Sequence, residues 1–470
     1  MTTKCFNIEL ISHKLPENIQ KKVSLLITKF LSNFINRSSS LRPDVKPSEI
    51  FAWASLDFAN SGYTTVVLTA VFNAYFVSTI MEGNINATLV WTSILSVSYL
   101  LVMITAPWLG AYADFSGNHK LILYVATIIC SFSTIFLGFC SSESLILAAV
   151  LLVISNFSYS VHQDIAASYL ANFCKNNQLG RISGVGWSWG FVGGITTLIL
   201  CFLWIYNAPY FFINTNITEQ IKVAGSMIIT GGIFGLVSLL ALQRLKKFKP
   251  LNSNENWEGA WSRVISSVHR GQDCKDLYDF LLCIFVYQAG IATVITVAAI
   301  YAKEVMNFSI EQTIIMIMIV NITASIGAFS FGFLQDRIGH KKSLLMSLIL
   351  WLMTVILIFL SSSHQVFWIA ANFAGLAMGA SQSGARAAIA HMSPINKQAE
   401  NFGLWGFSIN AASAVGPFTY GLITFLTDNN HRLSILIIAS FFIVGIFLLM
   451  RCNFRSPDEM KKDRKLNFKV

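Results

Sequence analysis

Two similar strings decide how this chain folds: GAYADFSGNHK at residues 110–120 and GFLQDRIGHKK at residues 332–342. Each contains G-x-x-x-D-x-x-G closely followed by a lysine, and each lies between two long apolar runs. The first glycine allows two helices to approach closely, and the second permits a tight turn. The aspartate between them can accept hydrogen bonds from the N-terminus of a neighbouring helix. Two such strings at equivalent places indicate two related halves.

The residues of these strings suit a gate better than a binding site. A clamp between an aspartate and a helix terminus can break and re-form when two helix bundles rock against each other. The alternative is a pair of ordinary tight turns. The gate residues that we infer are Gly110, Asp114, Gly117 and Lys120 in the first string, and Gly332, Asp336, Gly339 and Lys341 in the second.

The composition places both strings in a membrane protein. Of the 470 residues, 54% are hydrophobic and only 12% are charged, whereas a soluble domain carries roughly 25% charged residues. This excludes a soluble enzyme with a single membrane tail. Because a spanning helix needs about 20 apolar residues, the apolar content suffices for roughly twelve spans. We predict an all-α polytopic protein with spans at residues 51–80, 88–113, 120–140, 144–171, 181–206, 222–243, 277–302, 310–335, 342–360, 364–393, 400–427 and 431–451.

The spans divide the chain into two six-helix bundles, residues 49–243 and 277–451, joined by a polar linker at 244–276. Alternate loops and tails hold 30 of the 33 Lys and Arg residues, and basic loops are retained in the cytoplasm. We therefore expect both termini, the linker and both gate strings to be cytoplasmic. Residues 1–48 contain KKVSLLITKFLSNFI, an amphipathic helix that rests on the bilayer surface or packs against the protein's own loops. The tail, residues 452–470, is basic.

Ionisable groups inside spans are costly in lipid, so they mark the candidate functional site. Asp57 in helix 1 shares a helical face with Asn60. Asp164 and His162 lie in the fourth predicted helix (144–171). Arg386 lies in the tenth (364–393), on a face that it shares with Gln382. Asp57, Asp164 and Arg386 fall at a similar depth near the cytoplasmic ends of their helices.

Four further strings resemble one branch of the major facilitator superfamily, the group related to the autophagy-associated vacuolar amino-acid effluxer. They are WASLDFANSGYTT (53–65), GRISGVGWSWGFVGG (180–194), GASQSGARAA (379–388) and ENFGLWGF (400–407). The paired gate strings resemble the loop signature of that superfamily, whose halves are internal repeats around a central cavity. The resemblance implies a solute transporter, with amino-acid efflux in part of the branch, and places helices 1, 4, 7 and 10 around the cavity.

Three roles remain open for Arg386. It can pair with Asp57 or Asp164 across the halves when the protein is closed to the cytoplasm, or it can hold a substrate carboxylate with both ends of its guanidinium. The third role is a permanent structural ion pair within one half. For a polar solute, Asn60, Tyr63, Tyr287, Gln288 and Gln382 offer hydrogen bonds. His162 and Asp164 are candidates for proton coupling, although an intramembrane histidine can also serve packing alone.

We interpret the chain as a monomeric secondary transporter of a small organic solute, with amino acids or related compounds expected and proton coupling as an option. A different metabolite, a drug, a metal chelate, or a non-transporting sensor with the same fold are the alternatives. Eight scattered cysteines without a CxxC motif indicate no metal site, and we expect no cofactor, no enzymatic activity and no nucleic-acid partner. The bilayer is the plasma (inner) membrane, or the vacuolar membrane if the cell is eukaryotic.

Overall fold

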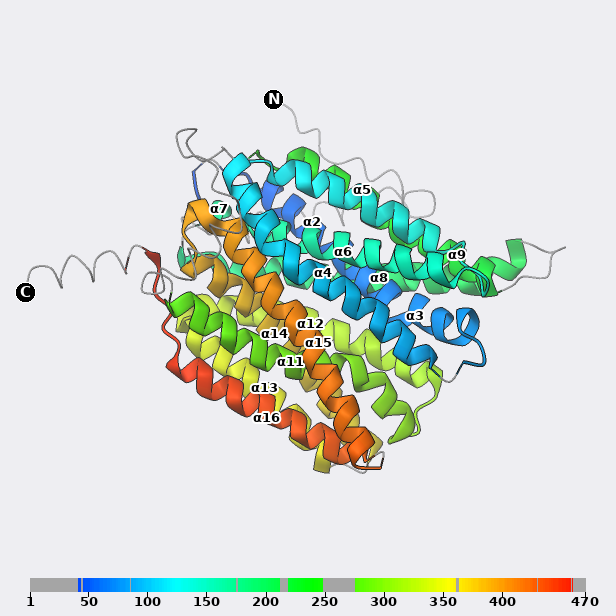
Figure 1. Ribbon diagram of the computed structural model, residues 1–470. Coiled ribbons are helices and arrows are strands. Elements are labelled where there is room, and N and C mark those ends of the chain that lie inside the picture. Colours follow the sequence, from blue (N-terminus) through cyan, green and yellow to red (C-terminus); the bar gives the residue numbers. More distant parts are fainter. Residues whose placement is uncertain are drawn as a thin grey trace, which may run out of the picture.

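The computed structural model describes residues 41–247, 275–457 and 459, apart from residues 44, 85, 175, 212–218, 361–362 and 429. The predicted amphipathic helix of the N-terminal segment and most of the linker therefore lie outside the described residues. Within them the twelve predicted spans are all helical, which confirms the all-α polytopic fold. Figure 1 shows the helices of the N-terminal half (blue to green) beside those of the C-terminal half (green to red).

Helix 1 changes its winding along its length. It begins with Pro47, whose fixed φ suits the first helical position. After Tyr63 the winding widens into a π-helix, a form that often occurs at functional sites. The segments of helix 1 are α2 (Pro47–Tyr63), η1 (Thr64–Ala70), α3 (Phe72–Tyr75) and η2 (Phe76–Ile80).

The other helices lie within a few residues of their predicted bounds. In the N-terminal half they are α4 (Ala87–Ser116), α5 (His119–Leu137), α6 (Leu145–Ala167) with the short α7 (Leu170–Phe173), α8 (Leu179–Phe211) and α9 (Glu219–Arg244). In the C-terminal half they are α11 (Lys275–Glu304), α12 (Ile310–Ile338), α13 (His340–Leu360), α14 (His364–Met392), α15 (Gln398–Leu426) and α16 (His431–Arg451).

Eleven helices of the described residues are long and apolar enough to cross a membrane by length and composition. The helix α14 is as long as its neighbours but is less apolar, since it carries Gln382, Arg386 and many small residues. Both polar side chains are buried inside the protein and not exposed to lipid. The helix α14 therefore brings the fold to twelve helices, and its polar side chains contact protein instead of lipid.

The two halves repeat one packing scheme. In the first, α2 packs against α8 and α9, α4 against α6, and α5 against α6 and α9. In the second, α11 packs against α15 and α16, α12 against α14, and α13 against α14 and α16. The halves meet along two long helix pairs, α4 with α15 and α8 with α12, which Figure 1 shows for α4 and the orange α15.

Both gate strings lie at the same end of this bundle, which we call the motif side. There the second glycine of each string adopts a positive φ, +70° at Gly117 and +88° at Gly339. A backbone with such φ values favours glycine because it has no Cβ. The tight turns that the two strings predict are therefore present between α4 and α5 and between α12 and α13.

Candidate functional site

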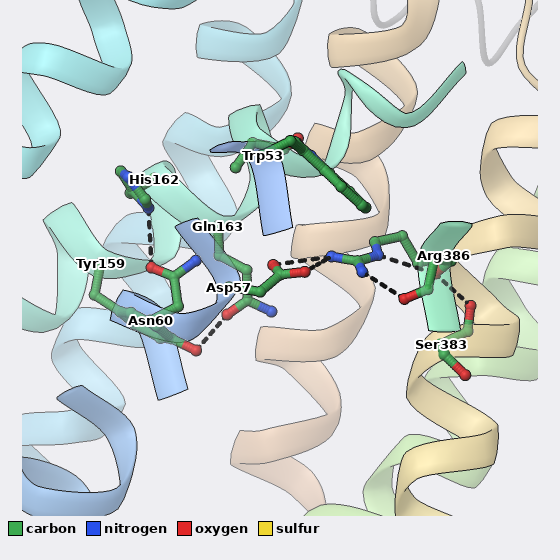
Figure 2. Close-up of polar contacts among 10 residues, drawn as sticks. Trp53, Asp57, Asn60, Tyr159, His162, Gln163, Ser383 and Arg386 are labelled. Atoms are coloured by element: carbon green, nitrogen blue, oxygen red, sulfur yellow. Dashed lines mark hydrogen bonds and ion pairs between the residues drawn. The ribbon is translucent and has the colours of Figure 1, made fainter. Parts of the chain in front are cut away.

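A buried ion pair joins the two halves near the motif side. One guanidinium nitrogen of Arg386 on α14 donates to both carboxylate oxygens of Asp57 on α2, at 2.9 Å and 2.7 Å. The Arg386 side chain is 2% exposed and the Asp57 side chain 9%. Figure 2 shows the two groups pointing toward each other from opposite halves. The pair is thus a contact between halves and not one within a half.

The rest of the Arg386 guanidinium is held by α8 of the N-terminal half. Its Nε donates to the hydroxyl of Ser183 at 3.0 Å, and its second terminal nitrogen donates to the Ser183 carbonyl at 2.9 Å. The Ser183 hydroxyl in turn donates to the carbonyl of Ser383 on α14, at 2.8 Å. These bonds satisfy a charge that would otherwise be very costly to bury. They also add a second link between the halves beside the ion pair.

Two tryptophans cover the same guanidinium. Its central carbon lies 4.6 Å from the centre of the Trp53 ring and 5.4 Å from that of Trp187. Both distances are within the range of cation–π attraction. The Trp187 indole nitrogen is buried and has no hydrogen-bond partner among the described residues. In this conformation Trp187 therefore lies over Arg386.

Gly186 lies directly against the ion pair. A Cβ at this position would be 2.6 Å from both a terminal nitrogen of Arg386 and an oxygen of Asp57, and 2.9 Å from the Trp53 ring. Real Cβ atoms do not approach other heavy atoms so closely. Only glycine therefore leaves room for the pair as it stands. The sequence shows that this helix is rich in glycine. It does not show that Gly186 makes room for the ion pair, because helical spacing does not reveal which glycine faces which neighbour.

The aspartate of the first string clamps the N-terminus of α15 in the other half. Asp114 accepts a hydrogen bond from the backbone nitrogen of Glu400 at 2.8 Å, and its other oxygen lies 3.1 Å from Nε2 of His119. A Cβ on Gly110 would collide with the carbonyl of Ala399. This glycine is thus what allows α4 to approach the start of α15.

The second string makes the mirror contact onto the first half. Asp336 accepts hydrogen bonds from the backbone nitrogens of Gly180 at 2.9 Å and Arg181 at 3.0 Å, at the start of α8. A Cβ on Gly332 would lie 2.7 Å from the Gly180 carbonyl. Each half therefore places a carboxylate on a helix N-terminus of the other, where the helix dipole favours negative charge.

The lysines of the two strings have a matching role that the sequence did not predict. Lys120 donates to the carbonyl of Leu245 at 3.0 Å, just beyond α9. Lys341 donates to the carbonyls of Met450 at 2.6 Å and Cys452 at 3.1 Å, where α16 ends. Each lysine thus caps the C-terminus of the last helix in its own half, which the helix dipole favours.

Neutralising the two gate aspartates is expected to weaken the contacts between the halves at the motif side, with each substitution adding to the effect. Asp114→Asn and Asp336→Asn each remove a charge-assisted bond to a helix N-terminus, which is worth about 1–2 kcal/mol. Spin labels on cysteines introduced at the exposed Asn118 and Lys342, in a background without native cysteines, report the separation of the halves. Each variant should shift the distribution of label distances toward longer values, and the shift in the double variant should equal the sum of the two single shifts.

The control for this measurement is Asp428→Asn, because Asp428 is an exposed loop residue after α15, away from the motif side. It should leave the distribution unchanged. Unchanged distributions in Asp114→Asn and Asp336→Asn would contradict a gate role for the two strings.

Polar residues around the ion pair form a second group. The Asn60 side-chain oxygen lies 2.9 Å from Nδ1 of His162, as Figure 2 shows, and both residues are buried in the N-terminal half. Asp164 on α6 is 6% exposed and faces Gly406 of α15, where an added Cβ would collide with the carboxylate. Its Oδ2 has no hydrogen-bond partner among the described residues. Of the two carboxylates predicted to pair with Arg386, the structure joins Asp57 and leaves Asp164 apart.

Four predicted polar residues remain outside these contacts. The Tyr63 hydroxyl bonds to Ser155 of its own half at 2.9 Å. Tyr287 is fully buried, and its Cβ would contact a side chain placed at Gly445 of α16. Gln288 and Gln382 are 6% and 9% exposed.

The chain resembles known transporters over most of its length. The model of the family described as vacuole effluxer Atg22 like matches residues 73–460. The uncharacterised MFS-type transporter YxiO of Bacillus subtilis (strain 168) is 22% identical over 402 residues, which cover 85% of this chain and 93% of YxiO. Autophagy-related protein 22 of Eremothecium gossypii is 24% identical over 344 residues, which cover 64% of this chain and 63% of that protein.

Solved structures agree at the level of the fold. The major facilitator superfamily transporter FucP, in its outward conformation, superposes with a TM-score of 0.67 at 15% identity, covering 86% of this chain and 98% of FucP. The twelve-helix fold, with its repeated gate strings and buried pair between the halves, defines a major facilitator transporter. Since the family model spans most of the sequence, the chain belongs to the Atg22-like vacuole effluxer family.

Proposed function

We propose that this transporter moves amino acids or closely related small solutes as a monomer by alternating access, and that its motif side faces the cytoplasm. The observation that carries the proposal is the Asp57–Arg386 pair, at 2.7 Å, buried between two halves that must separate in any such cycle. A carrier needs contacts between halves that are strong enough to close one side and can still be exchanged. An ion pair whose partner a charged solute can replace meets both needs.

The chemistry of the pair favours a solute with both a carboxylate and an amine. A solute carboxylate can take the place of Asp57 on the guanidinium, because carboxylates match its planar array of donors. Asp57, once released, is then a carboxylate able to receive an ammonium group. The name of the matched family, vacuole effluxer, agrees with movement of solute toward the cytoplasm.

The orientation of the proposal rests on the distribution of basic residues. In the predicted alternation of loops, the set that includes both gate strings holds 30 of the 33 Lys and Arg residues, and basic loops are retained on the cytoplasmic side of a membrane. We propose the plasma membrane as the site of action, or the vacuolar membrane in a eukaryotic cell.

Reconstitution into liposomes with a panel of labelled amino acids, with and without an imposed proton gradient, tests this function. We expect uptake of at least one amino acid, and its loss in Arg386→Gln. The matched control is Lys222→Gln, whose side chain pairs with Glu219 at the side opposite the motifs and should not matter. No uptake of any amino acid, together with saturable binding of another solute, would overturn the substrate class.

Arg386→Lys tests the contact with a solute carboxylate more narrowly. Lysine keeps the positive charge but lacks the planar pair of donors, so the apparent affinity for the transported amino acid should fall at least tenfold. An unchanged apparent affinity would count against binding of a carboxylate by Arg386.

Asp164 is the residue that we propose for proton coupling. Its carboxylate is buried against Gly406, and Oδ2 lacks a partner, a setting in which the neutral acid is favoured over the anion. Asp164→Asn imitates the neutral acid permanently. We expect the variant to exchange labelled for unlabelled solute at near wild-type rates but to lose accumulation driven by a proton gradient. If accumulation survives in Asp164→Asn, the proton is carried elsewhere.

A further inference from the structure

The chain does not leave the bundle when α16 ends at Arg451. Residues 452–457 turn back over the motif side of the C-terminal half, and we call them the C-terminal strap. Lys341 holds the start of the strap through the Cys452 carbonyl at 3.1 Å. Arg455 pairs with Asp276 at the start of α11, at 2.7 Å, and the Asp276 side chain is only 7% exposed. The strap is thus fastened to both α13 and α11.

An aromatic contact places the middle of the strap on a pair of histidines. The Phe454 ring packs edge-on against Phe280 of α11, with centres 4.8 Å apart, and lies 6.2 Å from the ring of His340 at a small interplanar angle. The ring of His340, at the start of α13, is 4.7 Å from that of His391, near the end of α14. The pair lies at the motif side, where both residues are intermediate between buried and exposed.

The hydrogen bonds of His340 require its ring to be neutral. The side-chain nitrogen of Gln335 lies 2.6 Å from Nδ1 of His340 and also donates to the carbonyl of Gly384, at 2.9 Å. An amide nitrogen only donates, so Nδ1 must accept. A proton on Nδ1 would place the N–H of His340 against the N–H of Gln335. Rotating the Gln335 amide would relieve this clash, but it would break the hydrogen bond from Gln335 to the Gly384 carbonyl.

The equivalent histidine of the first half has a different partner. His119, at the start of α5, has its Nε2 3.1 Å from the carboxylate of Asp114. In the second half Asp336 is engaged with the start of α8, and the ring next to His340 is another histidine. A proton on His340 thus lacks the carboxylate that serves His119, and it would be repelled by a proton on His391.

The other charged groups around the histidine pair do not replace that carboxylate. Glu459 and the Phe454 backbone lie close to His391. Glu459 is itself bound to the backbone nitrogen and hydroxyl of Ser456, at 2.7 Å and 2.9 Å. On the motif-side parts of the packed elements, the remaining charged residues are Lys275, Asp276 and Asp279 on α11, Asp336 and Arg337 on α12, Lys341 and Lys342 on α13, Arg386 on α14, and Arg455 on the strap.

The amide that contacts His340 lies next to both links between the halves. Gln335 precedes Asp336, which clamps the start of α8. Its second partner, Gly384, lies two residues before Arg386 on α14. We propose that the C-terminal strap is a pH-sensitive latch: neutral His340 keeps it fastened, and a proton on His340 from the motif side releases it and loosens the contacts between the halves.

Hydrogen–deuterium exchange of the full-length protein in lipid nanodiscs, at pH 7.5 and pH 5.5 and corrected for intrinsic rates, tests the latch. Strap peptides should exchange at least tenfold faster at the lower pH, and peptides from the start of α8 should follow. In His340→Gln, which keeps an acceptor for Gln335 but cannot be charged, the strap should stay protected at both pH values. In His391→Gln the midpoint of release should move to lower pH, because without the repelling neighbour the fastened state tolerates a proton on His340 more easily.

Two further variants keep the result clear. Gln335→Glu gives a protonated His340 a carboxylate, so the strap should stay protected at pH 5.5, and the variant can replace His340→Gln if that variant misfolds. It also removes the donor to the Gly384 carbonyl, so peptides of α14 around Gly384 should exchange faster at both pH values. His364→Gln, at an exposed histidine on the opposite side, should behave like the wild type. Equal strap exchange at the two pH values in the wild type, or persistent release in His340→Gln, would overturn the latch. The measurement needs no solute, so its outcome is separate from the identity of the substrate.

Discussion

Arg386→Gln is expected to abolish solute uptake and to leave the motif side predominantly open. The change leaves Asp57 as a buried carboxylate without its cation and removes the donors to Ser183. Breaking a buried ion pair from one side costs about 3–5 kcal/mol. Since about 1.4 kcal/mol corresponds to a tenfold change in an equilibrium, the ratio of closed to open states should fall at least a hundredfold. The spin labels at residues 118 and 342 measure the opening, and liposome uptake measures the function.

The double variant Asp57→Asn with Arg386→Gln distinguishes a transport role from a purely structural one. It removes both charges, so neither is left buried alone, and the closed state should recover most of its stability. Uptake should nevertheless stay lost, because no cation remains to exchange one carboxylate for another. If uptake returns along with the closed state, the pair serves only to hold the halves together.

The fold could be predicted because its signals are local and repeated. Apolar runs of sufficient length mark the spans, and the two gate strings mark the repeat, since the turns at Gly117 and Gly339 depend only on adjacent residues. Even α14, which is not among the eleven helices long and apolar enough to cross a membrane in the described residues, was predicted as a span at residues 364–393. Local winding was the exception, because the π-helix at Thr64–Ala70 has no distinct sequence pattern.

The candidate site could be predicted only in part, because depth along a helix follows from the sequence and rotation about its axis does not. Asp57 and Asp164 lie at a similar depth, yet only Asp57 is turned toward Arg386. The same limit hid the role of Ser183. The histidine pair was missed because His340 and His391 belong to different helices and meet only through the packing of α13 on α14.

Gly186→Ala is expected to reduce uptake at least tenfold without altering any charge. The new Cβ would lie 2.6 Å from the atoms of both Arg386 and Asp57, so the pair must separate or α8 must move away. The variant therefore tests the placement of the pair, whereas Arg386→Gln tests its charge. Alanine raises helix propensity by about 1 kcal/mol over glycine, so any loss must come from the contact and not from the helix itself.

Gly232→Ala is the matched control, because a Cβ at Gly232 on α9 would meet nothing within 4 Å. It makes the same change of residue in another spanning helix and should leave both uptake and the label distance as in the wild type. In Gly186→Ala the label distance should lengthen toward that of Arg386→Gln, since both variants separate the same two groups. If Gly186→Ala transports normally while the labels report a closed motif side, the close approach of α8 is dispensable. The 2.7 Å contact between Arg386 and Asp57 would then not be what closes this transporter.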